Sequence, residues 1–305
     1  MSKRRFLFVV LLFLIVSLII DRAGAVWLGY RYMLSNEKAA CAYSVDSCCD
    51  VVILGSSRAH YHYNPYIIDS ISGLSCYNYG SSGKNIIFDY AILSLLMEKD
   101  KKPKVCLLEV FYKDIVVAEK MWELGGLSSL FPLYGKNSGV DSVLYLMGEK
   151  EIMPIIFSHT YRYNTRIISF LRDAAIGPKD CNNGFESVDG MIDEPISSLR
   201  YNSDYNETKI FYLNKFVEKC KDNDVKCILC ISPMFFDNKP SLSKMYEPLW
   251  NIAQSNDVQV WDDSYSELFL NDSTLFRDHH HLNKKGVEIY SKIIAERLKK
   301  LHLNY

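Results

Sequence analysis

From residue 50 onward, short apolar runs alternate with segments in which apolar residues recur at helical spacing. The apolar runs are rich in β-branched residues and end in turn-forming residues, which is typical of strands buried on both faces. These runs lie at 50–55, 74–80, 104–111, 225–233 and 257–263. The segments with helical spacing lie at 84–98, 208–220, 247–255 and 284–301. This alternation predicts an α/β fold in which helices cover both faces of a parallel sheet of about five strands.

One region interrupts the alternation. Residues 113–200 separate the third and fourth predicted strands and are far longer than an ordinary crossover. They include a predicted helix near 163–173 and a polar loop at 181–190. The region is either an insertion that decorates the sheet or a lid beside the edge where the strands end.

The N-terminus has a different pattern. Lys3, Arg4 and Arg5 precede an apolar run at 6–20 that only Ser17 breaks. A basic cluster before an apolar segment tends to stay on the cytoplasmic side of the membrane. The run, of about 15 residues, is short for a spanning helix and suits a signal peptide.

The residues after the run leave its fate open. The small residues at 23–25 resemble a cleavage site, but Asp21 and Arg22 are unusual there, and Trp27 and Tyr30 suit a membrane interface. An uncleaved anchor, a cleaved signal and a buried core helix are the three interpretations. The first two predict a membrane segment at 1–30 and a domain at 31–305 outside the cytoplasmic membrane, either periplasmic or at the cell surface, and secreted if cleavage occurs.

Composition narrows the function classes. Lys and Arg total 35 against 36 Asp and Glu, so the chain lacks the basic excess of a nucleic-acid-binding protein. Nine cysteines in 305 residues are too sparse for a disulfide scaffold. Cys41, Cys48 and Cys49 have the option of pairing locally or with Cys76 outside the membrane. The cysteines at 106, 227 and 230 lie in predicted strands and are expected to be buried thiols.

Three polar segments follow predicted strands and are candidates for chemistry. Ser56 and Ser57 follow the first strand, where backbone N–H groups at a helix start can stabilise an oxyanion, or where a serine simply caps the helix. A glycine-containing turn, Asn78 to Gly83, follows the second strand. Because parallel strands end at the same edge of a sheet, these segments and the last polar segment are expected to lie together.

That last segment is Asp278-His279-His280-His281, before the terminal helix. Residues three apart face the same side of a turn, so Asp278 is placed to orient the imidazole of His281. This is the base half of a Ser-His-Asp triad. The alternatives are a solvated loop, or a metal site with His60 and His62, for which no carboxylate or cysteine pattern completes a ligand set. The sequence therefore predicts no metal and no cofactor.

Together these motifs resemble the SGNH (GDSL-like) hydrolase superfamily, whose first block reads Gly-Asp-Ser and whose last reads Asp-x-x-His. Gly55-Ser56-Ser57 matches the first block with Ser56 in place of Asp, and Asp278 and His281 match the last. The resemblance implies a three-layer α/β/α, flavodoxin-like fold. It implies Ser57 as nucleophile, with Ser56 as the fallback, and the N–H groups of Ser57 and Gly83 as an oxyanion hole. Arg58, Asn78 and Asn85 are candidate substrate contacts.

The resemblance is incomplete at the third block, Gly-x-Asn-Asp, whose Asn completes the oxyanion hole. Residues 108–114 read LEVFYKD and contain no Asn. The sequence predicts a serine esterase or O-acyltransferase acting on acyl esters of cell-envelope glycans. The expected partners are an acylated carbohydrate, the cytoplasmic membrane and, as a candidate, a membrane-bound acyltransferase. The alternative is a catalytically silent SGNH-like module that binds envelope glycan or a membrane partner.

Overall fold

The structure is a computed structural model of the chain, and it describes residues 2–116, 124–176, 182–192, 204–235, 244–270 and 272–301. The described residues form two compact units. The sheet unit comprises residues 45–126 and 181–305, and the anchor unit comprises residues 1–44 and 127–180.

The sheet unit is built on five parallel strands in the order β2-β1-β3-β4-β5. The strands are β1 (Val51–Gly55), β2 (Cys76–Asn78), β3 (Val105–Glu109), β4 (Lys226–Ile231) and β5 (Gln259–Asp262). All five lie within the runs that the sequence predicts. The strand order reverses around β1, because β2 lies on one side of it and β3 on the other. Ligands bind at such a switch point in open α/β sheets.

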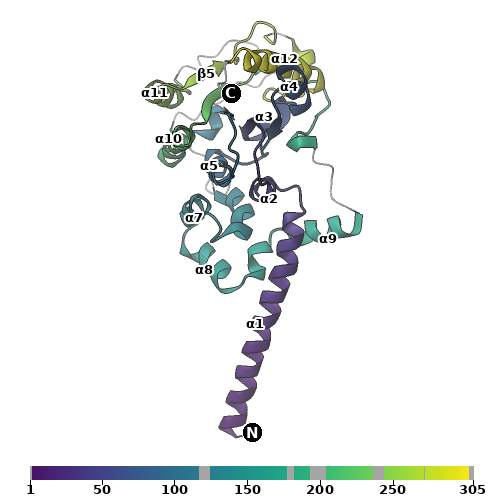
Figure 1. Cartoon of the computed structure of the whole chain (residues 1–305), viewed down its shortest axis with the longest axis vertical. Coiled ribbons are helices and arrows are strands. Elements are labelled where there is room, and N and C mark those ends of the chain that lie inside the picture. Colours follow the sequence, from purple (N-terminus) through teal and green to yellow (C-terminus); the bar gives the residue numbers. More distant parts are fainter. Residues whose placement is uncertain are drawn as a thin grey trace. The chain divides into compact units, whose positions relative to one another are not determined.

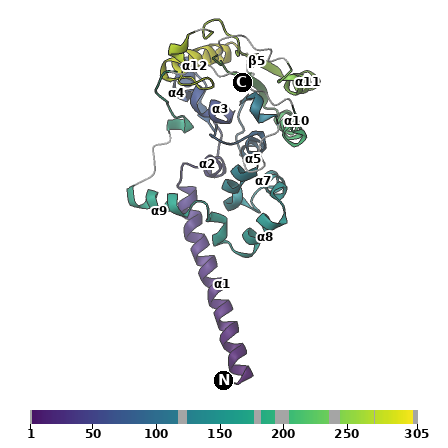
Figure 2. The same ribbon diagram turned by 180° about the vertical axis from the view of Figure 1, so that it is seen from behind.

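Helices cover both faces of the sheet, as the sequence predicts (Figures 1 and 2). On one face α12 (Lys284–Lys299) packs against α4 (Pro65–Ser72) and α3 (Ser57–His62). On the other, α10 (Glu207–Lys221) packs against α5 (Ile86–Leu96) and α11 (Glu247–Asn256). The helix start predicted at Ser56 and Ser57 is the start of α3. Helix α4 was not predicted, since it is too short to show a helical repeat.

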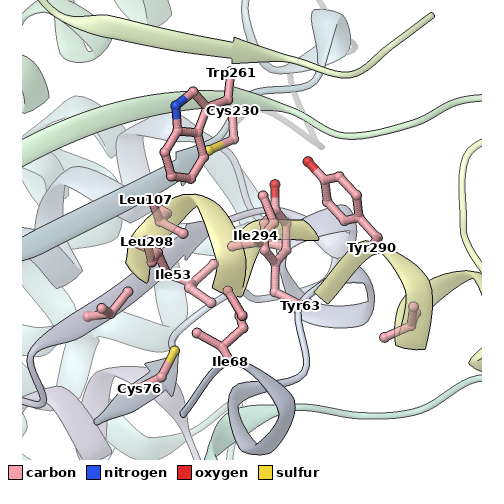
Figure 3. Close-up of a cluster of buried hydrophobic side chains, with 14 of the residues drawn as sticks. Ile53, Tyr63, Ile68, Cys76, Leu107, Cys230, Trp261, Tyr290, Ile294 and Leu298 are labelled. Atoms are coloured by element: carbon pink, nitrogen blue, oxygen red, sulfur yellow. The ribbon is translucent and has the colours of Figure 1, made fainter. Parts of the chain in front are cut away.

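Side chains from the strands and from α12 meet in the core beneath α12 (Figure 3). Ile53 and Leu107 project from neighbouring strands toward Ile294 and Leu298 of the helix. Successive strand residues face opposite sides, so alternate residues fill the core under α5 and α10. The sheet is therefore fixed from both sides, and this rigidity positions the loops at its carboxyl edge.

The anchor unit contains the long helix α1 (Lys3–Met33), and it is otherwise made of short helices. These are α2 (Lys38–Ser44), η2 (Gly125–Leu133, mostly in this unit), α7 (Ser138–Leu144), η3 (Tyr145–Met147), α8 (Glu149–Phe157), η4 (Thr160–Tyr163) and α9 (Ile167–Ile176). The helix predicted near 163–173 corresponds to η4 and α9. The middle of the predicted insertion thus packs with the N-terminal helix, since η4 and α9 contact α1.

Helix α1 is long and apolar enough to cross a membrane, and its most apolar stretch is not buried. The side chains of residues 6–16 and 18–20 are exposed, and both views show this half of α1 extending away from the rest of its unit (Figures 1 and 2). This exposure removes the interpretation of a buried core helix. An anchor and a signal sequence are the two interpretations that fit.

Candidate active site

The loop that follows β1 is shaped by Gly55. Its φ is +135°, and a Cβ atom there would lie 2.5 Å from the carbonyl oxygen of Glu109 on the neighbouring strand. Only glycine fits such a close approach in this backbone conformation. The chain then turns sharply, and Ser57 becomes the first residue of α3. The Ser57 side chain is thereby placed at the carboxyl edge of the sheet, at the strand-order switch.

The turn before α12 carries Asp278 and His281. One carboxylate oxygen of Asp278 accepts hydrogen bonds from the backbone N–H groups of His280 and His281, at 2.9 and 3.0 Å. The other lies 2.9 Å from Nδ1 of His281. On the far side of the ring, Nε2 of His281 lies 2.8 Å from Oγ of Ser57. The structure thus joins Ser57, His281 and Asp278 in one chain of hydrogen bonds.

The ionisation of Asp278 determines which ring nitrogen of neutral His281 carries the hydrogen. Partial burial alone would raise its pKa, but the hydrogen bond and charge of His281 and two backbone N–H groups lower the pKa of Asp278 to about 2. The ionised carboxylate requires a hydrogen on Nδ1 of His281. The lone pair on Nε2 then faces the hydroxyl of Ser57, which is the arrangement needed for the imidazole to accept the serine proton.

Ser56 has a different environment. Its side chain is buried, and its hydroxyl donates to Asp114 at 3.3 Å. Asp114 also accepts from the backbone N–H of Phe111 at 2.9 Å, and burial raises the pKa of Asp114 to about 6. Of the two serines, Ser57 is the one in contact with the imidazole.

A buried ion pair lies directly beneath this site. Arg58 and Glu109 are at most 1% exposed, and Nε of Arg58 lies 2.8 Å from a carboxylate oxygen of Glu109. Glu109 also accepts from the hydroxyl of Tyr63 and from the backbone N–H and hydroxyl of Ser232. These contacts compensate for the loss of water around the carboxylate. We call Arg58, His62, Tyr63, Glu109 and Ser232 the buried polar cluster.

The buried polar cluster connects the loops that carry the serine and the histidine. Burial, with the charges of Arg58 and His281, holds the pKa of His62 well below its usual range, so its ring is neutral. Nε2 of His62 accepts from the backbone N–H of Leu282 at 3.1 Å, and Nδ1 donates to Oγ of Ser232 at 2.7 Å. Hydrogen bonds therefore run from Arg58, next to Ser57, to Leu282, next to His281.

The glycine turn after β2 is fixed against α3. A Cβ atom on Gly80 would lie 2.4 Å from the backbone nitrogen of His60, so glycine permits the close approach. The side chain of Asn78 accepts from the N–H of Gly80 and donates to the carbonyl of Ala59. The N–H of Ser81 donates to the carbonyl of Gly55 at 2.9 Å. The segment 81–83 therefore begins beside the loop that carries the serine.

Two of the three predicted substrate contacts lie inside the domain. Arg58 and Asn78 are fully buried, and their hydrogen bonds hold the loops of the domain together. Neither side chain has a surface that a substrate could reach, because a charge and an amide without water need internal partners. Asn85 is partly exposed, but its side chain caps α5 by accepting from the N–H of Ile87. Gly83 is exposed, with a φ of +74°.

At and after the end of β3, where the third block of the family carries an asparagine, this chain carries Glu109 and Asp114. Glu109 and Asp114 both point into the domain, toward the buried polar cluster and Ser56 respectively. Neither a glutamate nor an aspartate paired in this way offers a donor to an oxyanion. The sequence did not show which partners these side chains contact. The one signal of an internal role was a polar residue at or directly after the end of a buried strand, as at Glu109 and Ser232.

Among the described residues, the cysteines form no disulfide and the histidines take part in no metal site. No disulfide joins the cysteines of the described residues, and the three predicted in strands are buried thiols. Within the described ranges, no group of three His, Cys, Asp or Glu residues is arranged to hold a metal ion. His60 instead contacts the carbonyl of Gly80, and His62 belongs to the buried polar cluster.

No protein-family model matches the chain, and no curated protein matches it. Several solved structures are similar. A lipolytic protein of the G-D-S-L family from Desulfitobacterium hafniense is 12% identical, with a TM-score of 0.42 over 82% of this chain and 99% of that one. An acetylxylan esterase from Geobacillus stearothermophilus is 10% identical, with a TM-score of 0.42 over 86% of this chain and 98% of that one.

A GDSL-like lipase from Bacteroides thetaiotaomicron is 14% identical, with a TM-score of 0.40 over 89% of this chain and 97% of that one. Two of these three neighbours, the lipolytic protein and the lipase, carry the G-D-S-L name that the sequence motifs resemble. At such identities and TM-scores, they assign no residue and no substrate in this chain.

Proposed function

We propose that this chain is a membrane-anchored serine esterase or O-acyltransferase of the SGNH type, acting outside the cytoplasmic membrane. The single observation that carries the proposal is the hydrogen-bonded chain from Ser57 through His281 to Asp278. Residues 224 positions apart meet there with the distances that general-base activation of a serine requires.

In the proposed reaction, Oγ of Ser57 attacks the carbonyl carbon of an acyl ester while Nε2 of His281 takes the serine proton. Asp278 stabilises the imidazolium that results. The tetrahedral oxyanion would accept hydrogen bonds from the N–H groups of Ser57 and Gly83. Collapse expels the alcohol, which receives the proton from His281. An acyl group then remains on Ser57.

The second half of the reaction decides the product. His281 removes a proton from water, which makes the enzyme an esterase, or from a sugar hydroxyl, which makes it an O-acyltransferase. In either case the new oxygen attacks the acyl carbon and Ser57 leaves with the proton. Glycans of the cell envelope are the proposed substrates because the basic residues before the apolar run favour an extracytoplasmic location for the domain. A membrane-bound acyltransferase is a candidate source of the acyl group.

The missing asparagine motivates the alternative of a catalytically silent module. Loss of one oxyanion-hole donor costs about 2.7–4 kcal/mol of transition-state stabilisation in other enzymes. Slow turnover is therefore expected of this mechanism.

The test uses the detergent-solubilised full chain, a fluorophosphonate probe and a small acetyl ester. Ser57→Ala is expected to abolish labelling and to lower turnover at least about 10³-fold. The matched control is Ser56→Ala, which removes the neighbouring hydroxyl but should retain labelling. Labelling that persists in Ser57→Ala would show that another residue is the nucleophile. Absence of both labelling and turnover in the unmodified chain, together with glycan binding, would favour the silent module.

A further inference from the structure

The anchor unit exposes large apolar side chains close to helix α1. Met153, Ile156 and Phe157 lie three and four positions apart on α8, so they share one face of that helix. They are 46%, 38% and 70% exposed, while Ile152 and Ile155 on the opposite face are buried. This exposed face therefore lacks a covering element within the described residues.

One neighbouring element adds to this surface. Tyr161 lies on η4, which begins at the end of the loop at 158–160 and contacts α1, and it is 40% exposed. We call Met153, Ile156, Phe157 and Tyr161 the apolar patch. Helix α9 contacts α1 farther along the helix, where Phe170 packs against Tyr32, so its exposed Ile168 is not part of the patch.

The loop after α8 is fixed to α1 at a defined position along the axis of that helix. The Asp21 carboxylate accepts from the hydroxyls of Ser158 and Thr160, each at 2.6 Å, and from the N–H of His159 at 2.9 Å. Gly24 allows close packing, since a Cβ atom there would lie 3.0 Å from the methyl group of Thr160. Phe157 directly precedes this loop, so it is held near the level of Asp21.

That level matches the outer end of a membrane span counted along α1. A hydrocarbon core of about 30 Å needs roughly 20 helical residues. Counted from Phe6, the first apolar residue after the basic cluster, such a span reaches about residue 25. The loop at 158–160 binds α1 between Asp21 and Gly24. Trp27 and Tyr30 are exposed beyond this level, where aromatic side chains favour the interface.

We propose that the apolar patch lies in the outer interface of the bilayer and contacts phospholipid acyl chains beside α1. The inference rests on the proposed anchoring of the chain by α1. A single spanning helix leaves its attached domain able to rotate and tilt about one axis. A second lipid contact through α8 and η4 restricts both motions, so the anchor unit becomes a platform at a fixed depth.

The experiment uses the full chain reconstituted in phosphatidylcholine nanodiscs, with p-benzoylphenylalanine replacing one phenylalanine at a time. Position 157 tests the apolar patch, and position 13, which is 68% exposed in the apolar run of α1, tests the anchor. The matched control is position 211 on α10 of the sheet unit, which is 55% exposed. Irradiation followed by mass spectrometry then identifies the partner of each cross-link.

The proposal expects phosphatidylcholine adducts at positions 157 and 13 and at least tenfold fewer at 211. Adducts at 13 with none at 157 would overturn the second contact while supporting the anchor. No lipid adduct at 13 would contradict the anchoring itself, and the inference with it. Cross-linking of position 157 to a second copy of the chain or to another protein would show that the patch is a protein interface.

Discussion

Arg58 is fully buried in the sheet unit, whereas Phe157 is 70% exposed in the anchor unit. Each side chain is in the environment that usually disfavours it. Arg58 compensates with hydrogen bonds to Glu109 and Ser232. Phe157 has no such compensation in water, because exposure of large apolar side chains is favourable only against another apolar surface.

The difference shows what each unit is built to hold in place. In the sheet unit, buried charges orient two loops so that Ser57 and His281 meet. In the anchor unit, polar groups of the loop at 158–160 donate hydrogen bonds to Asp21 of α1, and large apolar side chains are exposed. Buried polar side chains therefore fix the positions of the site loops in the sheet unit. Exposed apolar side chains in the anchor unit instead favour contact with another apolar surface. Four substitutions test this contrast.

The largest effect is expected from Asp278→Asn. A neutral amide no longer requires the hydrogen on Nδ1 of His281, so the tautomer with a hydrogen on Nε2 becomes populated and cannot accept the serine proton. We expect kcat for a small acetyl ester to fall by about 10³–10⁴-fold. The control is Asp272→Asn, since Asp272 accepts from the N–H of Thr274 at a neighbouring short helix. A variant at position 278 that keeps half its activity would remove Asp278 from the mechanism.

The next largest effect is expected from Glu109→Ala, which leaves the Arg58 charge buried without its partner. We expect the free energy of unfolding in detergent to fall by about 3–5 kcal/mol. Glu218→Ala is the matched control, because Glu218 forms an exposed ion pair of 2.8 Å with Lys215. Exposed pairs contribute about 0–1 kcal/mol. Equal effects of the two substitutions would refute the structural importance of the buried polar cluster.

Asp114→Asn tests the buried carboxyl under Ser56. The folded-state pKa of about 6 exceeds the ordinary value of 3.8, so the folded chain holds this proton more tightly than the unfolded chain does. The contribution of Asp114 to stability is therefore fully present below about pH 4 and is lost as pH rises through 6. The decline amounts to up to about 3 kcal/mol. Denaturant unfolding at pH 4.5 and 7.5 should show a smaller difference for the variant, and an unchanged difference would contradict the raised pKa.

The smallest effect on folding is expected from replacing both Met153 and Phe157 by Ser. Exposed side chains contribute little to stability, so the unfolding free energy in detergent should change by about 0.5 kcal/mol or less. Turnover of a soluble ester should be unchanged. Phe170→Ser is the contrasting control in the same unit, because Phe170 is buried against Tyr32 and its loss should cost about 3–5 kcal/mol. A large loss of stability in the double variant would mean that the patch is part of the core.

The sequence predicted every strand of the sheet and the four long helices that cover it, because burial on both faces leaves a clear pattern of apolar residues. The start of α3 was predicted at Ser56 and Ser57, but α4 and α8 were not predicted, since a helix of two turns carries too few apolar residues to show a repeat. The serine, histidine and aspartate were predicted from their places after strands. Arg58 and Asn78 were predicted to contact the substrate, whereas the structure buries both, because an exposed polar residue and a buried one look alike in a sequence.

The local pattern of side chains alone determined the order of the elements, the membrane-compatible N-terminal helix and the edge at which the polar motifs gather. These properties depend on neighbours a few residues apart, which the sequence displays directly. Only the tertiary structure decided that Glu109, His62 and Ser232 join the two loops of the site, and that Asp21 binds the loop after α8. These partners are separated by 123 to 170 positions. Their contacts are stabilised by burial and by the hydrogen bonds that form as the chain folds, and neither leaves a periodic pattern in the sequence.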